Sequence, residues 1–147
     1  MFRYNLKRIV LIAMYVSPMW FEVGLACGQQ KGHATSLNMV RFERDSDVAC
    51  LKSAVETGDP STGPSTVVLE VPQHCVIPWH YHSAEEQLIV SRGVVLTEMG
   101  SDEKVKLGPG GFAVMPGGER HQFTCSSHKM CILFVTFNGK YDIFWVH

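Results

Sequence analysis

The sequence has no excess of charge of either sign, and it lacks any stretch rich in Lys and Arg. Its 13 basic and 14 acidic side chains give a formal net charge of −1. A protein that binds DNA or RNA needs a basic stripe or patch to neutralise the phosphates. We therefore expect no nucleic-acid partner. With 46% hydrophobic and 18% charged residues, the composition is that of an ordinary globular protein.

A long hydrophobic run is also missing. Three basic residues near the start precede an apolar run at residues 9–16, which Pro18 and Glu22 then interrupt. A membrane span needs about 20 consecutive apolar residues. A basic start, a short apolar run and a small-residue ending are typical of a secretory signal that is cleaved. The sequence predicts a signal peptide over residues 1–27 and an exported protein, either periplasmic or secreted.

Cys27 leaves a second interpretation of this segment open. It follows Leu25 and Ala26 directly, which resembles the lipoprotein box of bacterial signal peptides. The fit is imperfect, because Gly24 stands where Leu or Val is usual. Lipidation of Cys27, with anchoring to the membrane, is therefore the alternative to a simple cleaved signal.

The cysteines lack the C-x-x-C spacing that is typical of structural zinc sites. After Cys27 the sequence contains Cys50, Cys75, Cys125 and Cys131. An even number of cysteines in an exported protein permits disulfides, and Cys125 and Cys131 flank a predicted hairpin turn. Reduced and buried cysteines are the favoured interpretation, because free cysteine is often interior. The pairing stays open.

The sequence shows no long segment with a helical period after the first 27 residues, and it has no internal repeat. Residues 28–46 are polar and unpatterned, which predicts a linker with room for one strand at its end. Residues 47–147 predict one all-β domain of short strands separated by turns, typical of a sandwich or barrel. The predicted strands cover residues 65–71, 76–82, 87–91, 94–99, 104–107, 112–115, 121–125, 131–137 and 143–146.

The sequence does contain two short blocks of His and Glu. His80 and His82 lie two residues apart in a predicted strand, so their side chains face the same side about 7 Å apart. Glu86 would lie about 13 Å from His82 on a straight strand, so the chain must bend for the carboxylate to join them. His121 follows Gly and Pro residues that set a turn before another strand.

Three imidazoles and one carboxylate suit a divalent transition metal, whether Mn, Fe, Co, Ni, Cu or Zn. Four protein ligands leave two positions free on an octahedral ion. Free positions, which water, dioxygen or a substrate can take, distinguish catalytic from structural sites. The predicted ligands are His80, His82, Glu86 and His121.

These two blocks resemble the two motifs of the cupin superfamily. Residues 80–93 fit the pattern H-x-H-x3-E-x6-G, and residues 110–121 fit G-x5-P-x-G-x2-H. The resemblance covers residues 65–137 well and 47–147 loosely. It implies a single-domain double-stranded β-helix, or jelly-roll barrel, with the metal inside near one mouth. The chain also looks similar to exported bacterial cupins of undefined function.

Two positions depart from the family pattern. His74 stands where the first motif usually opens with Gly, and Cys125 stands where the second often closes with Asn. Neither position is a ligand in the family, so the resemblance still implies an intact metal site. Cys125 shares strand parity with His121, which predicts a thiol that could line the pocket.

The ligand set predicts a metal-dependent enzyme for a small organic substrate, with dioxygenase, isomerase and lyase chemistry all open. Glu85 is the candidate for a catalytic base. Arg92 and Arg120 are candidate clamps for an anion, although a solvated surface role is favoured for both. The alternative function is a binding or sensing module that holds a small ligand through the metal without turnover. A homodimer is a further option, because exposed jelly-roll edges pair readily.

Overall fold

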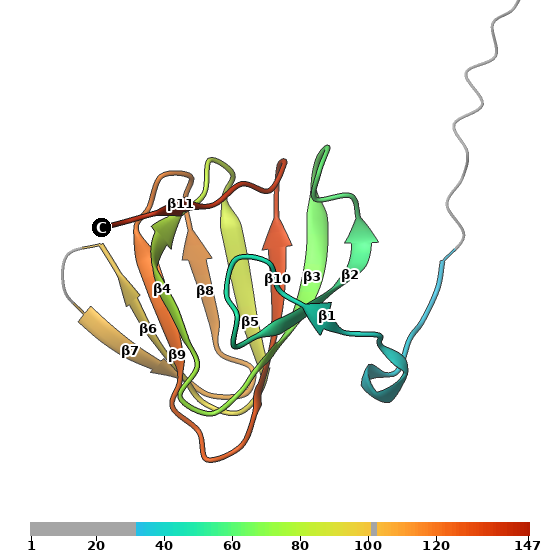
Figure 1. Cartoon of the computed structure of the whole chain (residues 1–147), viewed down its shortest axis with the longest axis horizontal. Helices are drawn as coiled ribbons and strands as arrows, with labels where there is room; N and C mark the ends of the chain where they lie inside the picture. Colours follow the sequence, from blue (N-terminus) through green and yellow to red (C-terminus); the bar gives the residue numbers. More distant parts are fainter. Residues whose placement is uncertain (1–31, 101–102) are drawn as a thin grey trace, which may run out of the picture. The chain divides into compact units, whose positions relative to one another are not determined.

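The computed structural model describes residues 32–100 and 103–147. Within it, Thr35–His147 forms one compact unit built mainly of β-strands (Figure 1). The predicted signal at residues 1–27, including Cys27, lies outside the described residues. In the part of the chain that is described, no helix has the length and apolar character needed to cross a membrane.

The described residues contain eleven strands and one short 3-10 helix. In chain order they are η1 (Leu37–Met39), β1 (Glu43–Arg44), β2 (Lys52–Gly58), β3 (Ser65–Val71), β4 (Val76–Tyr81), β5 (Glu86–Arg92), β6 (Val95–Met99), β7 (Glu103–Leu107), β8 (Phe112–Met115), β9 (His121–Cys125), β10 (Cys131–Phe137) and β11 (Phe144–Trp145).

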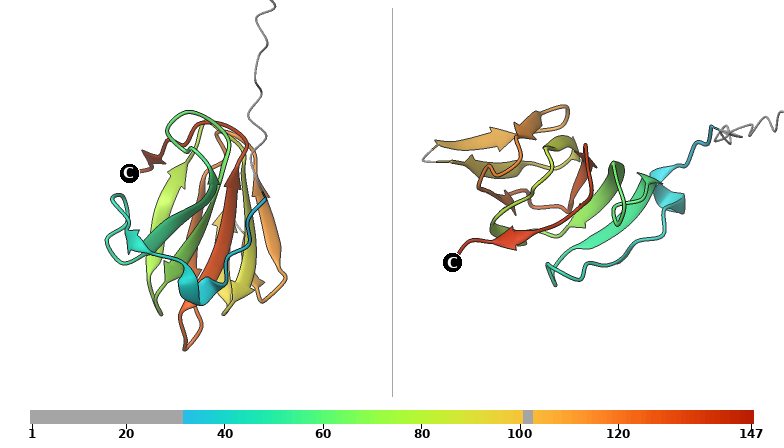
Figure 2. Two further views of the ribbon diagram at one scale, coloured as in Figure 1. Left: turned by 90° about the vertical axis from the view of Figure 1, so that its right-hand side faces the viewer. Right: turned by 90° about the horizontal axis from the view of Figure 1, so that it is seen from above.

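The strands form two antiparallel sheets that face each other (Figures 1 and 2). The six-stranded sheet has the order β1-β2-β3-β10-β5-β8, and the five-stranded sheet has the order β11-β4-β9-β6-β7. Strands that are distant in sequence lie side by side, with β10 between β3 and β5, and β9 between β4 and β6. This arrangement confirms the predicted all-β double-stranded β-helix.

An apolar core fills the space between the sheets. Side chains alternate along β5, where Leu88 and Val90 are buried and Gln87 and Ile89 are exposed. Because successive side chains of a strand point to opposite faces, this period of two directs every second residue into the core. Burial of these apolar side chains is the main force that holds the sheets together.

All nine predicted strands are present, and their ends agree with the prediction to within one residue. The strand β2 is not among those predicted, because both of its faces are partly exposed and its hydrophobic alternation is weak. Val55, in the middle of β2, is 53% exposed and stands at a register shift against β3. The compact unit also includes η1 and β1, which fall within the stretch predicted as a linker.

The favoured interpretation of the cysteines as reduced is wrong. Disulfides join Cys50 to Cys75 and Cys125 to Cys131. The second pair closes the hairpin between β9 and β10. The first pair ties the loop before β2 to the residue before β4, and no local pattern brings these two cysteines together. Their proximity follows only from the packing of the two sheets.

Candidate metal centre

The two predicted blocks meet in the interior, where the two sheets come together. His80 lies near the end of β4 and His121 begins β9, and these two residues are paired across the five-stranded sheet. His82 follows the end of β4, and Glu86 begins β5 in the six-stranded sheet. The four side chains therefore come from both sheets.

The bend required between His82 and Glu86 is present, and it is where the chain crosses from one sheet to the other. The carbonyl of His82 accepts a hydrogen bond from the amide of Gly118 at 2.8 Å. The amide of Ser83 donates to the carboxylate of Asp142 at 2.7 Å. A side chain at Gly117 would collide with the Ser83 carbonyl, and Gly118 has a φ of +85°. Both turn positions therefore need glycine.

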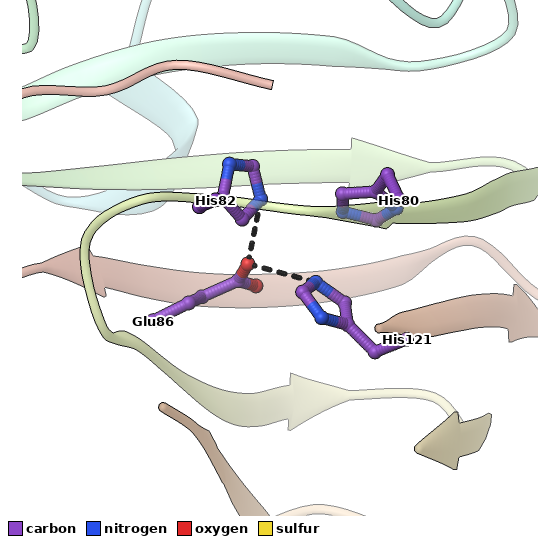
Figure 3. Close-up of side chains that lie close together, drawn as sticks. All are labelled: His80, His82, Glu86 and His121. Atoms are coloured by element: carbon purple, nitrogen blue, oxygen red, sulfur yellow. Dashed lines mark hydrogen bonds and ion pairs between the residues drawn. The ribbon is translucent and has the colours of Figure 1, made fainter. Parts of the chain in front are cut away.

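One donor atom from each of the four side chains lies within 4.8 Å of all the others. Figure 3 shows Glu86 between His82 and His121, with His80 alongside. The Glu86 Oε2 atom is 3.0 Å from His82 Nε2 and 3.2 Å from His121 Nε2. Each of the four residues is at most 4% exposed. The structure thus brings together all four residues that the sequence predicts as ligands.

The second nitrogen of each imidazole is bound to the backbone. His80 and His121 donate from Nδ1 to the carbonyl oxygen two residues earlier, at 2.6 and 2.8 Å. His82 Nδ1 donates to the carbonyl of Asp142. A carbonyl only accepts, so each Nδ1 carries a proton. Each Nε2 is then left to face the place where the four donor atoms converge. Metal-binding histidines almost always have such a partner on the other nitrogen.

Burial and hydrogen bonding shift the pKa values of the centre in opposite directions. Burial would raise the pKa of Glu86, but hydrogen bonds from His121 and His82 outweigh it and hold that pKa at about 2. Burial and the neighbouring His121 lower the pKa of His80 to about 4. Burial would lower the pKa of His82, but its hydrogen bond to Glu86 raises it. At neutral pH, Glu86 is anionic and His80 is neutral, which are the forms that bind a metal.

The hydrogen bonds of the centre require an extra proton when no cation is bound. The carboxylate of Glu86 only accepts, and the Nδ1 atom of His82 already donates to a carbonyl. A ring that also donates from Nε2 to Glu86 must therefore carry both protons. A divalent cation would place positive charge at the same point. The donor set and its burial therefore fit a transition metal ion.

The centre lines part of a cavity of about 230 Å³. Most of its wall is apolar. The apolar residues are Val48, Leu51, Val55, Pro60, Val67, Leu69, Ile77, Leu88, Phe123, Val135, Phe137 and Ile143. Besides the centre, the polar residues that line it are Asp45, Ser46, Asp47, Ser53 and Tyr141. A cavity with apolar walls and a few polar groups is typical of a small-molecule site.

Residues 45–51, here called the strap, join β1 to β2 and form one wall of this cavity. The Oδ1 atom of Asp45 accepts hydrogen bonds from the amides of Asp47 and Val48, both at 2.9 Å. The Tyr141 hydroxyl donates to Asp47 Oδ2 at 3.2 Å. The disulfide from Cys50 ties the strap to the residue before β4. The strap is therefore fixed at several points.

Tyr141 lies between the strap and the metal centre. Its ring centroid is 5.4 Å from that of His82 and 5.1 Å from that of Phe137. Burial raises its pKa, and the negative charges of Asp47 and Asp45 raise it further. The phenol therefore keeps its proton at neutral pH. No motif marks Tyr141 or the strap in the sequence, because their place at the site depends on how distant strands pair.

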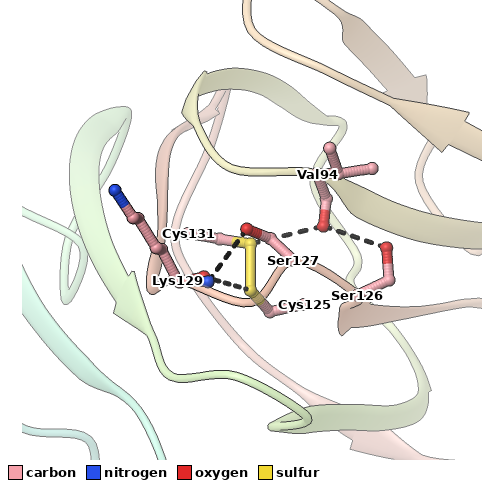
Figure 4. Close-up of a disulfide and its surroundings, with 6 residues drawn as sticks. All are labelled: Val94, Cys125, Ser126, Ser127, Lys129 and Cys131. Atoms are coloured by element: carbon pink, nitrogen blue, oxygen red, sulfur yellow. Dashed lines mark hydrogen bonds between the residues drawn. A yellow bond between two sulfur atoms is a disulfide. The ribbon is translucent and has the colours of Figure 1, made fainter.

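Several residues considered from the sequence are not brought to the cavity. The Glu85 carboxylate accepts a hydrogen bond from the exposed Gln87 at 2.8 Å, and Glu85 is not among the described lining residues. Arg92 and Arg120 are both exposed and lie outside the lining. Cys125 is bonded to Cys131 at the β9–β10 turn, so it offers no thiol to the pocket (Figure 4).

Comparison with known proteins gives a consistent family. The profile described as a cupin domain matches residues 67–137. The polyketide cyclase RemF from Streptomyces resistomycificus has a TM-score of 0.66 and 20% identity, over 80% of this chain and 87% of that chain. KdgF from Halomonas sp. has a TM-score of 0.60 and 17% identity, over 74% and 94% of the two chains. The DMSP lyase DddQ from Ruegeria pomeroyi DSS-3 has a TM-score of 0.59 and 20% identity, over 77% and 59%.

No curated protein matches the sequence. At these identities the solved structures show a shared fold and no more. The matched profile spans β3 to β10 except for the first two residues of β3, and it includes all four residues of the centre. From this match, the jelly-roll topology and the similar structures, we conclude that the chain is a single-domain member of the cupin superfamily.

Proposed function

We propose that the protein holds a divalent transition metal through His80, His82, Glu86 and His121, and that it acts on a small organic molecule in the adjoining cavity. The observation that carries this proposal is the convergence of four buried donor atoms within 4.8 Å of one another. Each imidazole is also oriented by a backbone carbonyl. Two of the similar structures are a cyclase and a lyase, which supports small-molecule chemistry in this fold.

A bound metal would polarise an oxygen of the substrate, or provide redox chemistry with dioxygen if it were Fe, Mn, Cu or Ni. The apolar wall excludes water around the substrate, which strengthens electrostatic interactions inside the cavity. The Tyr141 phenol keeps its proton, since burial raises its pKa, and it donates a hydrogen bond to Asp47 at the cavity wall. Dioxygenase, isomerase and lyase reactions are all consistent with this arrangement.

One observation favours a binding or sensing module that does not turn its ligand over. Beyond the centre itself, Tyr141 and the two strap carboxylates are the titratable groups among the described residues that line the cavity. Glu85, the candidate base, bonds to Gln87 instead. Metal-dependent binding without chemistry is therefore our second candidate function.

Turnover by metal-loaded protein distinguishes the two functions. Purified protein would be loaded in turn with Mn, Fe, Co, Ni, Cu and Zn and incubated with oxidisable and isomerisable acids, phenols and sugars. Product formation that disappears in Glu86→Gln, but persists in Glu85→Gln, would support the enzyme. Recovery of a tight native ligand unchanged after incubation with metal and air would support the binding module.

We also propose that the protein is exported. The predicted signal over residues 1–27 supports this, and the two disulfides are typical of an oxidising compartment. Mass spectrometry of the mature N-terminus should find cleavage near residue 27, with or without a lipid on Cys27. An intact N-terminus on protein from the cytoplasm would contradict export.

A further inference from the structure

We infer that the cavity selects molecules that carry a positive charge beyond the group that meets the metal, and that it disfavours anionic ones. This inference rests on the proposed metal-dependent function and adds to it the sign of the charge that the substrate carries. It comes from the lining of the cavity, where negative charge is present on the strap and positive side chains are missing.

Three residues of the centre, His80, His82 and Glu86, line the cavity, so a metal held there could be reached from it. His80 lines the cavity and is only 3% exposed, yet its Nε2 atom makes no hydrogen bond within the described chain. Its Nδ1 atom is committed to the carbonyl of Pro78. In the proposed function the Nε2 atom of His80 is one of the four donors that would hold the metal. A bound metal would therefore meet a polar group of the molecule that enters the cavity.

After the metal centre, the strap contributes the second group by which the cavity would recognise a ligand. The hydroxyl of Tyr141 bonds to Asp47, while the Tyr141 ring lies 5.4 Å from the His82 ring. A single tyrosine side chain, that of Tyr141, therefore spans the distance between the Asp47 carboxylate and the His82 ring. A molecule bound at the centre needs only a short chain to reach it.

Both strap carboxylates have acceptor capacity that the protein does not use. Asp45 binds two backbone amides through Oδ1, and Asp47 accepts the Tyr141 and Ser46 hydroxyls through Oδ2. Within the described chain, the other oxygen of each carboxylate has no hydrogen bond and no ion pair. Because several hydrogen bonds and a disulfide fix the strap, the two carboxylates are held at the cavity wall, which lowers the entropy lost on binding.

Positive partners for an anion are missing from the same wall. None of the described residues that line the cavity is Lys or Arg. An anionic group beside Asp45 and the exposed Asp47 would meet like charges, and no Lys or Arg of the lining would offset them. An ammonium or guanidinium group would instead meet two carboxylates. The two carboxylates of the strap therefore determine whether the cavity favours positively or negatively charged molecules.

A matched set of three probes tests this inference. The probes are straight-chain hydroxamic acids of equal length that end in an ammonium, a methyl or a carboxylate group. The hydroxamate binds the metal in all three, so only the terminal charge differs. Their dissociation constants would be measured by calorimetry on zinc-loaded protein at low ionic strength. We expect the ammonium probe to bind about fivefold more tightly than the methyl probe, and the carboxylate probe to bind most weakly.

The paired variant Asp45→Asn with Asp47→Asn removes both charges but keeps an acceptor oxygen for the hydrogen bonds that Asp45 and Asp47 accept. Unchanged thermal unfolding would show that the strap is intact. In this variant the ammonium probe should bind no better than the methyl probe, whose affinity should not change. Glu70→Gln is the control, because it removes one negative charge from a residue that does not line the cavity and that meets Lys52.

The possible outcomes distinguish a failure of the charge inference from a failure of the proposed metal-dependent function. Equal binding of the three probes to zinc-loaded protein, or an ammonium preference that survives in the paired variant, would overturn the charge inference alone. Failure of all three probes to bind zinc-loaded protein would also overturn it. A protein that takes up no metal would overturn the proposed function and the charge inference with it.

Discussion

Each imidazole of the centre has one nitrogen bound to a backbone carbonyl and the other directed toward a common point. His82 illustrates the consequence, because its Nε2 lies 3.0 Å from Glu86 while its Nδ1 is bound to Asp142. Because it donates from both nitrogens, the His82 ring carries two protons when it is bound to Glu86 and no metal is present. The hydrogen bond to Glu86 raises the pKa of His82 against the opposing effect of burial.

Metal uptake should therefore release a proton. The raised pKa of His82 means that this ring holds its extra proton to higher pH than an ordinary histidine, and metal must displace it. We expect zinc binding to release a proton from His82 at pH values below its raised pKa, and zinc affinity to increase as pH rises through that pKa. Calorimetry in buffers that differ in ionisation enthalpy measures this release. A binding enthalpy that does not depend on the buffer would contradict it.

At the scale of elements, the turn between β3 and β4 contains the clearest departure from the family pattern. His74 stands where the first motif usually has Gly, and it has a φ of 62°. A side chain in this left-handed region is strained, which explains the preference for glycine there. His74 is exposed, so the turn tolerates its side chain without a clash in the core.

Replacement of His74 by Gly should stabilise the protein. The glycine removes the strain at positive φ, and the expected gain in the free energy of unfolding is about 1 kcal/mol. Denaturant unfolding of wild type and His74→Gly measures this difference. Gln73→Gly is the neighbouring control, since Gln73 does not have a positive φ, and it should be destabilising. Equal loss of stability in both variants would show that His74 is not strained.

The two disulfides differ in how easily a reductant reaches them. Cys50 is exposed on the strap, whereas Cys125 and Cys131 are 1% and 0% exposed. A mild dithiol should therefore reduce Cys50–Cys75 first, with transfer of two electrons and two protons to give two thiols. Thiol labelling followed by peptide mass spectrometry measures the order. Faster labelling of Cys125 and Cys131 would contradict the structure.

The parts of the fold that follow from the sequence are those encoded locally. Gly-rich turns and alternation located the predicted strands, and the two His and Glu blocks pointed to the four residues that converge in the structure. The strand β2 was missed because Val55 and its neighbours are partly exposed on both faces. Tyr141 and the Cys50–Cys75 pair were missed because they meet their partners only after distant strands pair.

At the scale of the whole compact unit, the centre joins the two sheets. His80 and His121 belong to the five-stranded sheet, and Glu86 belongs to the six-stranded sheet. A ligand that binds only the folded state stabilises it in proportion to the logarithm of its concentration. A metal at this point would therefore stabilise the fold as a whole. The homodimer that the sequence leaves open stays a prediction.

Metal should raise the thermal unfolding temperature of the protein. At a free zinc concentration of about 100 times the dissociation constant, the expected stabilisation is about 2.7 kcal/mol. Differential scanning calorimetry with zinc, and again after removal by a chelator, measures the shift. An unfolding temperature that zinc leaves unchanged in the wild type, while zinc is shown to bind elsewhere, would contradict a centre that joins the sheets.

The most direct test compares two adjacent glutamates. Glu86 faces the centre at 4% exposure, whereas Glu85 bonds to Gln87 outside the cavity. Zinc affinity of wild type, Glu86→Gln and Glu85→Gln would be measured by competition with a chelator of known affinity. We predict that Glu86→Gln weakens zinc binding by at least about 100-fold, because a ligand is lost, while Glu85→Gln binds like the wild type. Equal zinc affinity in all three proteins would contradict the metal centre.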